Sequence, residues 1–384
     1  MGEWREYKIS DIADVIGGGT PKTSVDEYWN GDIPWLAPRD LTGYDKVYIS
    51  HGDRFITEEG LKKSSTKLMP KGSVLLTSRA PIGYVAIAQN EICTNQGFKS
   101  LVPKKDLCNS EFLYYWIKSS VDYLQQLGTG TTFAEISGSV VKNIDISLPP
   151  LKEQKAIAEV LSCLDDKIDL LHRQNKTLEE MAQTLFRQWF IEEAKDEWEV
   201  GKLPDEFDFT MGLSPKGETF NEEGIGTPMY QGNADFEFRF PKNRVYTTDP
   251  KRYAEKFDTL ISVRAPVGAQ NMAKEKCCIG RGVASFRYKN DNSFYTYTYF
   301  KMMSLMNEIK QFNNSGTVFG SINKTDFQEM DIVIPPKELV MKFQKEVKPL
   351  DDKVIQNTFQ IKTLENMRDT LLPKLMSGEV RVKI

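Results

Sequence analysis

The sequence predicts an α+β protein in which two similar mixed α/β globules alternate with two long helices. Three observations predict this fold: an internal repeat, a narrow apolar stripe at the end of each half, and strand and turn patterns before each stripe. We expect the helices to pair as an antiparallel coiled coil, which gives the chain a pseudo-twofold internal repeat. The predicted boundaries are 1–148 and 199–334 for the globules, and 149–198 and 335–384 for the helices.

The two halves of the chain repeat one another over most of their length. The turn TSRAPIG at 77–83 returns as SVRAPVG at 262–268, a shift of 185 residues. Nearer the start of each half, GGGTPKT at 17–23 best matches MGLSPKG at 211–217, a shift of 194. The second copy has therefore lost about nine residues in its middle. The helical end of each half keeps a constant shift of 186, so the middle of each globule is where the copies diverge.

Each half ends in a predicted helix whose apolar positions alternate in steps of three and four residues. That spacing is typical of a coiled-coil seam, and the one asparagine in each stripe is expected to fix the register at a cost in stability. The alternative is a pair of ordinary amphipathic core helices. The predicted seam consists of Ile157, Leu161, Leu164, Ile168, Leu171, Asn175, Leu178, Leu185, Phe343, Val347, Leu350, Val354, Asn357, Ile361, Leu364 and Leu371.

Proline and charge add detail to the two helices. A Pro-Pro pair at 149–150 and another at 335–336 close the preceding strand and suit a first helical turn. Pro349 and Pro373 are expected to kink or interrupt the second helix. The first helical segment has a net charge of −5 and the second +3, which favours pairing between them.

The composition argues against several classes of protein. The hydrophobic fraction of 40% suits globular folding, and no apolar run reaches the roughly 18 residues of a membrane helix. The N-terminus lacks an apolar signal core, so we expect a cytoplasmic location and no membrane partner. Five irregularly spaced cysteines without a C-x-x-C pair predict free, mostly buried thiols, and two distant histidines argue against a metal site.

Catalytic motifs are absent from the sequence. There is no phosphate-binding loop of the G-x-x-x-x-G-K-[ST] type, and the glycine cluster at 17–20 lacks the context of a dinucleotide site. The paired carboxylates Asp165-Asp166 and Asp351-Asp352 are expected to be solvated on the flank of the coiled coil. The sequence therefore predicts a binding protein with no catalytic residue, no metal and no cofactor of its own.

Two runs around the Pro-Pro pairs carry a resemblance to a known family. IDISLPPLKEQKAIAEVLSCLDDKIDLL at 144–171 resembles the specificity subunit of type I restriction–modification enzymes, and MDIVIPPKELVMKFQKEVKPLDDKV at 330–354 repeats the pattern. GGGTPKT at 17–23 and GTTFAEIS at 130–137 also look like that family. The resemblance covers essentially the whole chain. The second copy departs from it, because PPKELVMKF lacks the Leu-x-Glu-Gln of PPLKEQ.

The resemblance implies a non-catalytic subunit that reads double-stranded DNA. Each globule would be a target recognition domain for one half of a split site, and the helices would set the spacing. They would also dock two methyltransferase subunits, which carry S-adenosylmethionine, and restriction subunits would join for cleavage. A pseudo-twofold arrangement matches the symmetry of the DNA backbone, and divergent globule middles predict an asymmetric site.

The divergent middles hold the candidate base-reading residues. Direct readout of base edges uses Arg, Lys, Asn and Gln side chains. The alternative for each candidate is exposed, solvated surface. The candidates are Arg39, Lys46 and Arg54 in the first globule, and Gln231, Asn233, Arg239 and Arg244 in the second.

Residues kept in both copies are instead expected to act independently of base sequence. Arg79 and Arg264 belong to the repeated turn and are predicted to contact DNA phosphates. Thr131 and Thr317 are weaker candidates for the same role. The alternative for the arginines is that each caps a strand end inside its globule.

Three other functions remain to be distinguished. A scaffold would bind protein partners without DNA affinity. A self-contained nuclease or methyltransferase would bind a cofactor on the isolated chain, although its motifs are missing. A dimeric transcription factor would need two like half-site readers, which the unlike globules do not supply.

Overall fold

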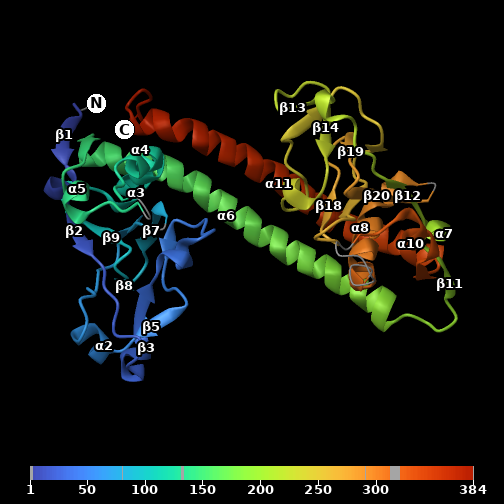
Figure 1. Cartoon of the computed structure of the whole chain (residues 1–384), viewed down its shortest axis with the longest axis horizontal. Helices are drawn as coiled ribbons and strands as arrows, with labels where there is room; N and C mark the ends of the chain where they lie inside the picture. Colours follow the sequence, from blue (N-terminus) through green and yellow to red (C-terminus); the bar gives the residue numbers. More distant parts are fainter. Residues whose placement is uncertain (1–2, 80, 131–133, 290, 312–320, 384) are drawn as a thin grey trace. The chain divides into compact units, whose positions relative to one another are not determined.

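The computed structural model describes residues 3–79, 81–130, 134–289, 291–311 and 321–383. The chain forms two compact units, each made of one globule and parts of both long helices, α6 (Leu151–Arg187) and α11 (Lys337–Met376) (Figure 1). The first unit comprises Met1–Leu170 and Ile361–Ile384, and the second comprises Leu171–Gln360.

The first globule is built on a five-stranded sheet with strand order β2-β9-β6-β7-β4 and a three-stranded sheet with order β5-β3-β8. A short β1–β10 pair lies next to the start of α6. Helix α3 begins after Asn109, whose side-chain oxygen accepts the backbone N–H of Phe112, as an N-cap should. The elements are β1 Arg5–Lys8, α1 Ile9–Ile12, β2 Ala13–Gly17, β3 Trp29–Leu36, β4 Tyr48–Ile49, β5 Arg54–Ile56, α2 Glu58–Lys62, β6 Val74–Ser78, β7 Ile82–Ala88, β8 Cys93–Thr94, β9 Lys99–Pro103, α3 Ser110–Ser119, α4 Val121–Gln126, α5 Gly138–Lys142 and β10 Asp145–Leu148.

The second globule repeats this plan with a four-stranded sheet of order β12-β20-β17-β18, a five-stranded sheet of order β13-β15-β14-β19-β16 and a β11–β21 pair. Its elements are β11 Glu199–Lys202, α7 Leu203–Glu206, β12 Phe207–Met211, β13 Phe220–Asn221, β14 Thr227–Tyr230, β15 Val245–Thr247, β16 Tyr253–Ala254, β17 Thr259–Ser262, β18 Gln270–Met272, β19 Cys277–Ile279, β20 Val283–Tyr288, α8 Tyr295–Ser304, α9 Met306–Gln311, α10 Lys324–Glu329 and β21 Asp331–Ile334.

Strand registers confirm the predicted repeat and both of its shifts. Each globule holds one equivalent parallel pair: Trp35 of β3 lies opposite Cys93 of β8, and Met229 of β14 lies opposite Cys278 of β19. The first members of these pairs are 194 residues apart and the second members 185. The nine-residue loss therefore falls between the two strands, in the segment that differs most between the copies.

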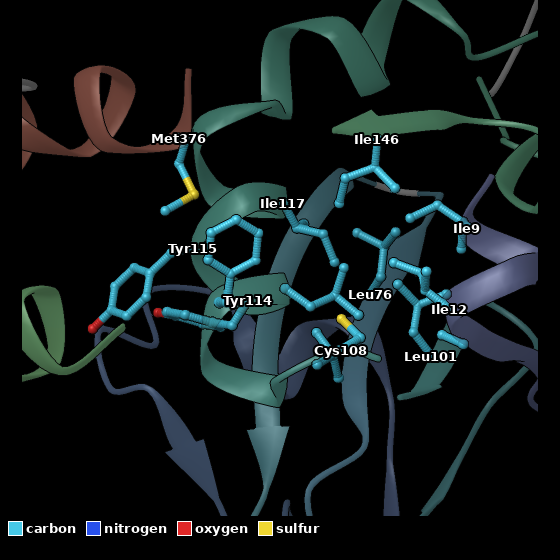
Figure 2. Close-up of a cluster of buried hydrophobic side chains, with 14 of the residues drawn as sticks. Ile9, Ile12, Leu76, Leu101, Cys108, Tyr114, Tyr115, Ile117, Ile146 and Met376 are labelled. Carbon is cyan, nitrogen blue, oxygen red and sulfur yellow. The ribbon is translucent and has the colours of Figure 1, made fainter. Parts of the chain in front are cut away.

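The core of the first unit joins the globule to both long helices. Figure 2 shows Leu76 and Leu101 of the sheet beside Ile117 of α3, with Met376 of α11 close to Tyr115 of α3. All five are at most 8% exposed. Each fully buried aliphatic side chain contributes about 1.5–3 kcal/mol to folding. The ends of the helices are thus part of the globule's core.

The core of the second unit is dominated by aromatic rings. Phe186 and Phe190, near the end of α6, lie 5.5 and 5.2 Å from the ring of Phe343 in α11. Tyr297 of α8 lies 5.3 Å from Phe190, so the globule closes this cluster. Edge-to-face pairs of this kind add about 0.5–1.5 kcal/mol each beyond their buried area.

The predicted seam is buried or half-buried at every one of its positions. Within each unit the two helices run antiparallel. Glu153 pairs with Arg381 and Asp165 with Arg368 in the first unit, and Asn175 meets Thr358 and Phe186 meets Phe343 in the second. The ends of both stripes join the globule cores, so the coiled-coil and core-helix interpretations each describe part of the seam.

The two seam asparagines sit at one level in the second unit. Asn175 Nδ2 lies 3.4 Å from Thr358 Oγ1, and Asn357 Nδ2 lies 3.5 Å from Gln174 Oε1. Both asparagines are at most 1% exposed. The amide of each asparagine thus lies close to the residue next to the other asparagine. This arrangement fits the predicted role of the two asparagines in fixing the register of the helices.

The prediction that proline interrupts the second helix is wrong. Helix α11 continues through Pro349 and Pro373 for 40 residues. Both prolines are exposed, and so are Lys345 and Asp369, whose carbonyl groups lose their helical donor. Water can satisfy these carbonyls, which lowers the cost of a proline at a solvated position.

Candidate nucleic-acid interface

The candidate residues of the first globule lie on and beside the β3–β5 pair. Arg39 is exposed, and one of its guanidinium nitrogens is 3.7 Å from Asp53. The guanidinium carbon of Arg54 lies 3.5 Å from the centre of the Trp29 ring, which leaves Arg54 half-buried. A stacked guanidinium keeps its N–H groups in its own plane, where they can still donate to a base edge.

Lys46 lies on the segment between β3 and β5 and reaches α6. Its ammonium group is 3.8 Å from Asp169, and both side chains are exposed. An exposed pair of this length contributes about 0–1 kcal/mol, so it leaves the lysine available to another anion.

The candidates of the second globule lie at the equivalent place, between β14 and β15. Gln231 is exposed directly after β14, and Asn233 is half-buried at the start of a short 3-10 helix. Arg244 donates from Nε to Asp235 Oδ1 at 2.9 Å while about half of its side chain stays exposed. The buried Asp235 therefore orients this arginine.

The base-reading role predicted for Arg239 is wrong. Its side chain is 0% exposed, and its Nη2 lies 3.2 Å from Glu179 Oε1 and 3.0 Å from Asp351 Oδ1. The guanidinium carbon also lies 3.9 Å from the centre of the Tyr299 ring. Reaching a base would leave the buried Asp351 and the partly buried Glu179 without their cation, which costs several kcal/mol.

The repeated turn has one hydrogen-bonding plan in both copies. The hydroxyl of Thr77 donates to the carbonyl of the turn's proline at 2.8 Å and accepts the amide after Gly83 at 2.9 Å. Ser262 makes the same two bonds, at 2.8 and 2.9 Å, in the second copy. Gly83 and Gly268 both have positive φ, at 103° and 85°, which favours glycine. The geometry of the turn thus accounts for most of the residues that are kept in both copies.

The arginines of the two turns have different surroundings. Arg79 is half-buried and lies 3.4 Å from Glu135, which also pairs with Lys99 at 3.2 Å. Arg264 is exposed, and its backbone bridges Ser321 as that of Arg79 bridges Glu135. The second copy thus has Ser321 in the place of the carboxylate of Glu135.

The partner of Glu135 has been lost as well, because the position of Lys99 in β9 is taken by Ala284 in β20. In the described part of the chain no carboxylate pairs with Arg264, and the segment 312–320 contains no acidic residue in its sequence. The strand-end interpretation fits Arg79, whereas Arg264 is exposed and its predicted phosphate contact stays a prediction. Thr131 and Thr317 lie outside the described residues.

The prediction that the paired carboxylates are solvated is wrong for the first aspartate of each pair. Asp165 accepts from Arg368 Nη1 at 2.8 Å and from the Tyr115 hydroxyl at 2.7 Å. Asp351 is 1% exposed and accepts from the Thr296 hydroxyl at 2.9 Å. Burial raises the pKa of Asp351 above its ordinary value, and the nearby guanidinium opposes that rise. These aspartates anchor other elements to the helices.

The start of each long helix is tied down by a glutamine. Gln154 accepts the backbone N–H of Asn109 at 2.9 Å through its side-chain oxygen. Gln344 accepts the N–H of Tyr297 at 3.0 Å in the second unit, although it lies one turn further along its helix. The missing Leu-x-Glu-Gln of the second copy is therefore replaced in function, and a shifted glutamine is hard to see in the sequence alone.

Comparisons with known proteins agree with this architecture. A family model described as the type I restriction modification DNA specificity domain matches residues 1–180 and 195–365. The chain is similar to the type I restriction enzyme MjaIX specificity subunit of Methanocaldococcus jannaschii, with 36% identity over 99% of this chain and 94% of that protein. It is also 23% identical to the HindI specificity subunit of Haemophilus influenzae, over 99% and 100% of the two chains.

One solved structure has the same fold over the full chain. The crystal structure of a type I restriction–modification S subunit from M. genitalium superimposes with a TM-score of 0.68 at 20% identity, covering 100% of this chain and 97% of that one. Among the described residues, no helix is long and apolar enough to cross a membrane.

Proposed function

The chain belongs to the family of DNA specificity subunits of type I restriction–modification enzymes and is a non-catalytic DNA-recognition subunit, and we propose that each globule binds one half of an asymmetric, split site in double-stranded DNA. One observation carries this proposal. The two globules share the parallel strand pair β3–β8 and β14–β19, but the side chains that follow it differ. Arg39 stands where the second copy has Asn233, and Arg54, opposite Trp35, stands where it has Val245, opposite Met229, so the two half-sequences should differ.

Protein partners of this family are methyltransferase and restriction subunits. We infer that two methyltransferase subunits dock, one for each copy of the repeat, and that each carries S-adenosylmethionine. Met181 of α6 and Met367 of α11 support two equivalent positions, because they are 186 residues apart and each is 48% exposed. Exposed apolar side chains of this size are common at protein interfaces. We also propose a cytoplasmic location, where the DNA of a prokaryotic host lies.

The role of the helices in spacing is part of the same proposal. Helices α6 and α11 are 37 and 40 residues long and pair antiparallel within each unit. Half-sites about one helical turn of DNA apart present the same face to two readers. We infer that the helices set the distance between the half-sites.

A base-resolution methylome of the host, with and without this gene, tests the function. Loss of methylation at one asymmetric, split motif is the expected result, and a plasmid copy of the gene should restore it. An unchanged methylome, together with no DNA binding by the complex reconstituted with its methyltransferase subunits, would contradict the proposal. Salt-insensitive binding to protein partners in that case would favour the scaffold interpretation.

A further inference from the structure

Two acidic side chains recur at equivalent places in the two units. Asp165 and Asp351 are 186 residues apart, and so are Glu179 and Glu365. In the second unit, Asp351 of α11 and Glu179 of α6 both face the guanidinium of Arg239. Glu179 and Asp351 of the second unit therefore form a socket for an arginine, whereas in the first unit Glu365 pairs with Lys362 at 3.4 Å and Asp165 alone is shown paired with an arginine.

The equivalent aspartates Asp165 and Asp351 receive their arginines from different elements. In the first unit, Arg368 of α11 supplies the guanidinium to Asp165 at 2.8 Å. The residue of α6 that corresponds to Arg368 is Ala182, which is 1% exposed. The helix arginine is thus missing from the second unit, and Arg239 from the β14–β15 segment takes its place.

The segment that carries Arg239 is held in an unusual conformation. Arg239 has a φ of 63°, which non-glycine residues rarely adopt. Its carbonyl accepts the N–H of Met272 at 2.9 Å. The next residue, Phe240, stacks on Phe359 of α11 with ring centres 5.0 Å apart. Strain at such a residue persists only where the surroundings hold it, and here both the globule, through Met272, and the long helices do so.

We propose that Arg239 is a positioning residue for DNA recognition, because it anchors the base-reading segment 231–244 to carboxylates of both long helices. The inference rests on the proposed DNA-reading function and deepens it. Gln231, Asn233 and Arg244 lie on this segment, so their placement depends on the anchor. The equivalent segment 37–53 of the first globule meets α6 through an exposed ion pair, and Asp165 there already pairs with a helix arginine.

A swap of the arginine separates positioning from stability. Arg239→Ala combined with Ala182→Arg moves the guanidinium from the recognition segment to α6, which copies the arrangement of the first unit. The variants are prepared as the full complex with the methyltransferase subunits, and the methylated motif is determined on a randomised DNA library. Arg368→Ala, which removes the equivalent arginine of the first unit, is the matched control.

The swap variant should unfold at a temperature closer to wild type than Arg239→Ala alone. Both should lose about tenfold in discrimination between bases within one half of the motif, while the other half stays unchanged. Arg368→Ala should leave that half intact. Glu179→Gln is a milder change that should relax the same half if either larger variant fails to fold.

Three results would overturn the inference. The first is a swap variant that recovers both stability and base discrimination. The second is a set of socket variants that methylate less but keep both halves of the motif as in wild type. The third is a relaxation of both halves together. A wild-type complex without any motif would instead refute the proposed function, and the anchor hypothesis would fall with it.

Discussion

The contrast between Arg79 and Arg264 predicts an unequal electrostatic grip on DNA by the two globules. Each phosphate contact adds about 0.9 to the slope of log K against log salt concentration. Between 50 and 200 mM salt, a fourfold change, one contact therefore accounts for about a 3.5-fold loss of affinity. Arg264→Ala should remove this component for every DNA sequence alike. Arg79→Ala should change the slope less than Arg264→Ala does, because Arg79 already shares the carboxylate of Glu135 with Lys99.

Fluorescence anisotropy of labelled duplexes, titrated with the reconstituted methyltransferase complex at several salt concentrations, measures these slopes. Glu135→Gln is the gain-of-function counterpart, because it frees Arg79 and should steepen the slope by about 0.9. Equal slope changes for Arg79→Ala and Arg264→Ala would refute the reasoning, since the carboxylate of Glu135 is the structural difference invoked. A loss confined to one DNA sequence would also refute it, because phosphates carry no sequence information.

Three further predictions concern stability. Burial raises the pKa of Glu206 from 4.5 to about 6, so the free-energy cost of its ionisation in the folded protein grows between pH 4.5 and 6 and is complete above pH 6. The Glu206→Gln variant should therefore gain up to about 2 kcal/mol in free energy of unfolding at pH 7.5 and little at pH 4.5, measured by urea denaturation. The buried Oδ1 atoms of Asn175 and Asn357 accept no hydrogen bond within the described chain. Replacing both residues by leucine should therefore raise the free energy of unfolding by about 1–3 kcal/mol and loosen helix register. Arg368→Met should lower the free energy of unfolding by about 3 kcal/mol, because Asp165 loses the cation it pairs with. Adding Asp165→Asn should recover part of this loss. An equal loss in the single and double variants would mean that packing, and not charge, determines the effect.

The repeat, the helices and the order of the elements were predictable because they depend on periodicity and on letters kept in both copies. Strand pairs such as Trp35 with Cys93 confirm the predicted shifts. Predictions from local sequence rules were wrong where solvent exposure or contacts with distant residues determine the structure. Pro349 looks like a helix breaker, but a solvated face tolerates it. Asp165 looks like a surface carboxylate, but Tyr115 and Arg368 cover it.

The candidate interface was less predictable, because an arginine has the same letter whether it meets a phosphate or a carboxylate. Arg79 and Arg264 occupy equivalent turns, and what separates them is the exchange of Glu135 for Ser321 far along the chain. Arg239 was placed among the base readers because it lies in the divergent middle. Its partners come from α6 and α11, and no local pattern connects them to the β14–β15 segment.

The position of divergence in the repeat follows from what each part contacts. A residue of a long helix faces the globule, the other helix or a protein partner, so changes there are constrained on several sides. The segment between β14 and β15 faces DNA on the proposed function and is free to change with the site. Arg239 and Phe240 differ from this pattern, since they lie in the free segment but contact the constrained helices. A new half-site acquired by changing this segment would therefore have to keep an arginine in reach of Asp351, or regain one at Ala182.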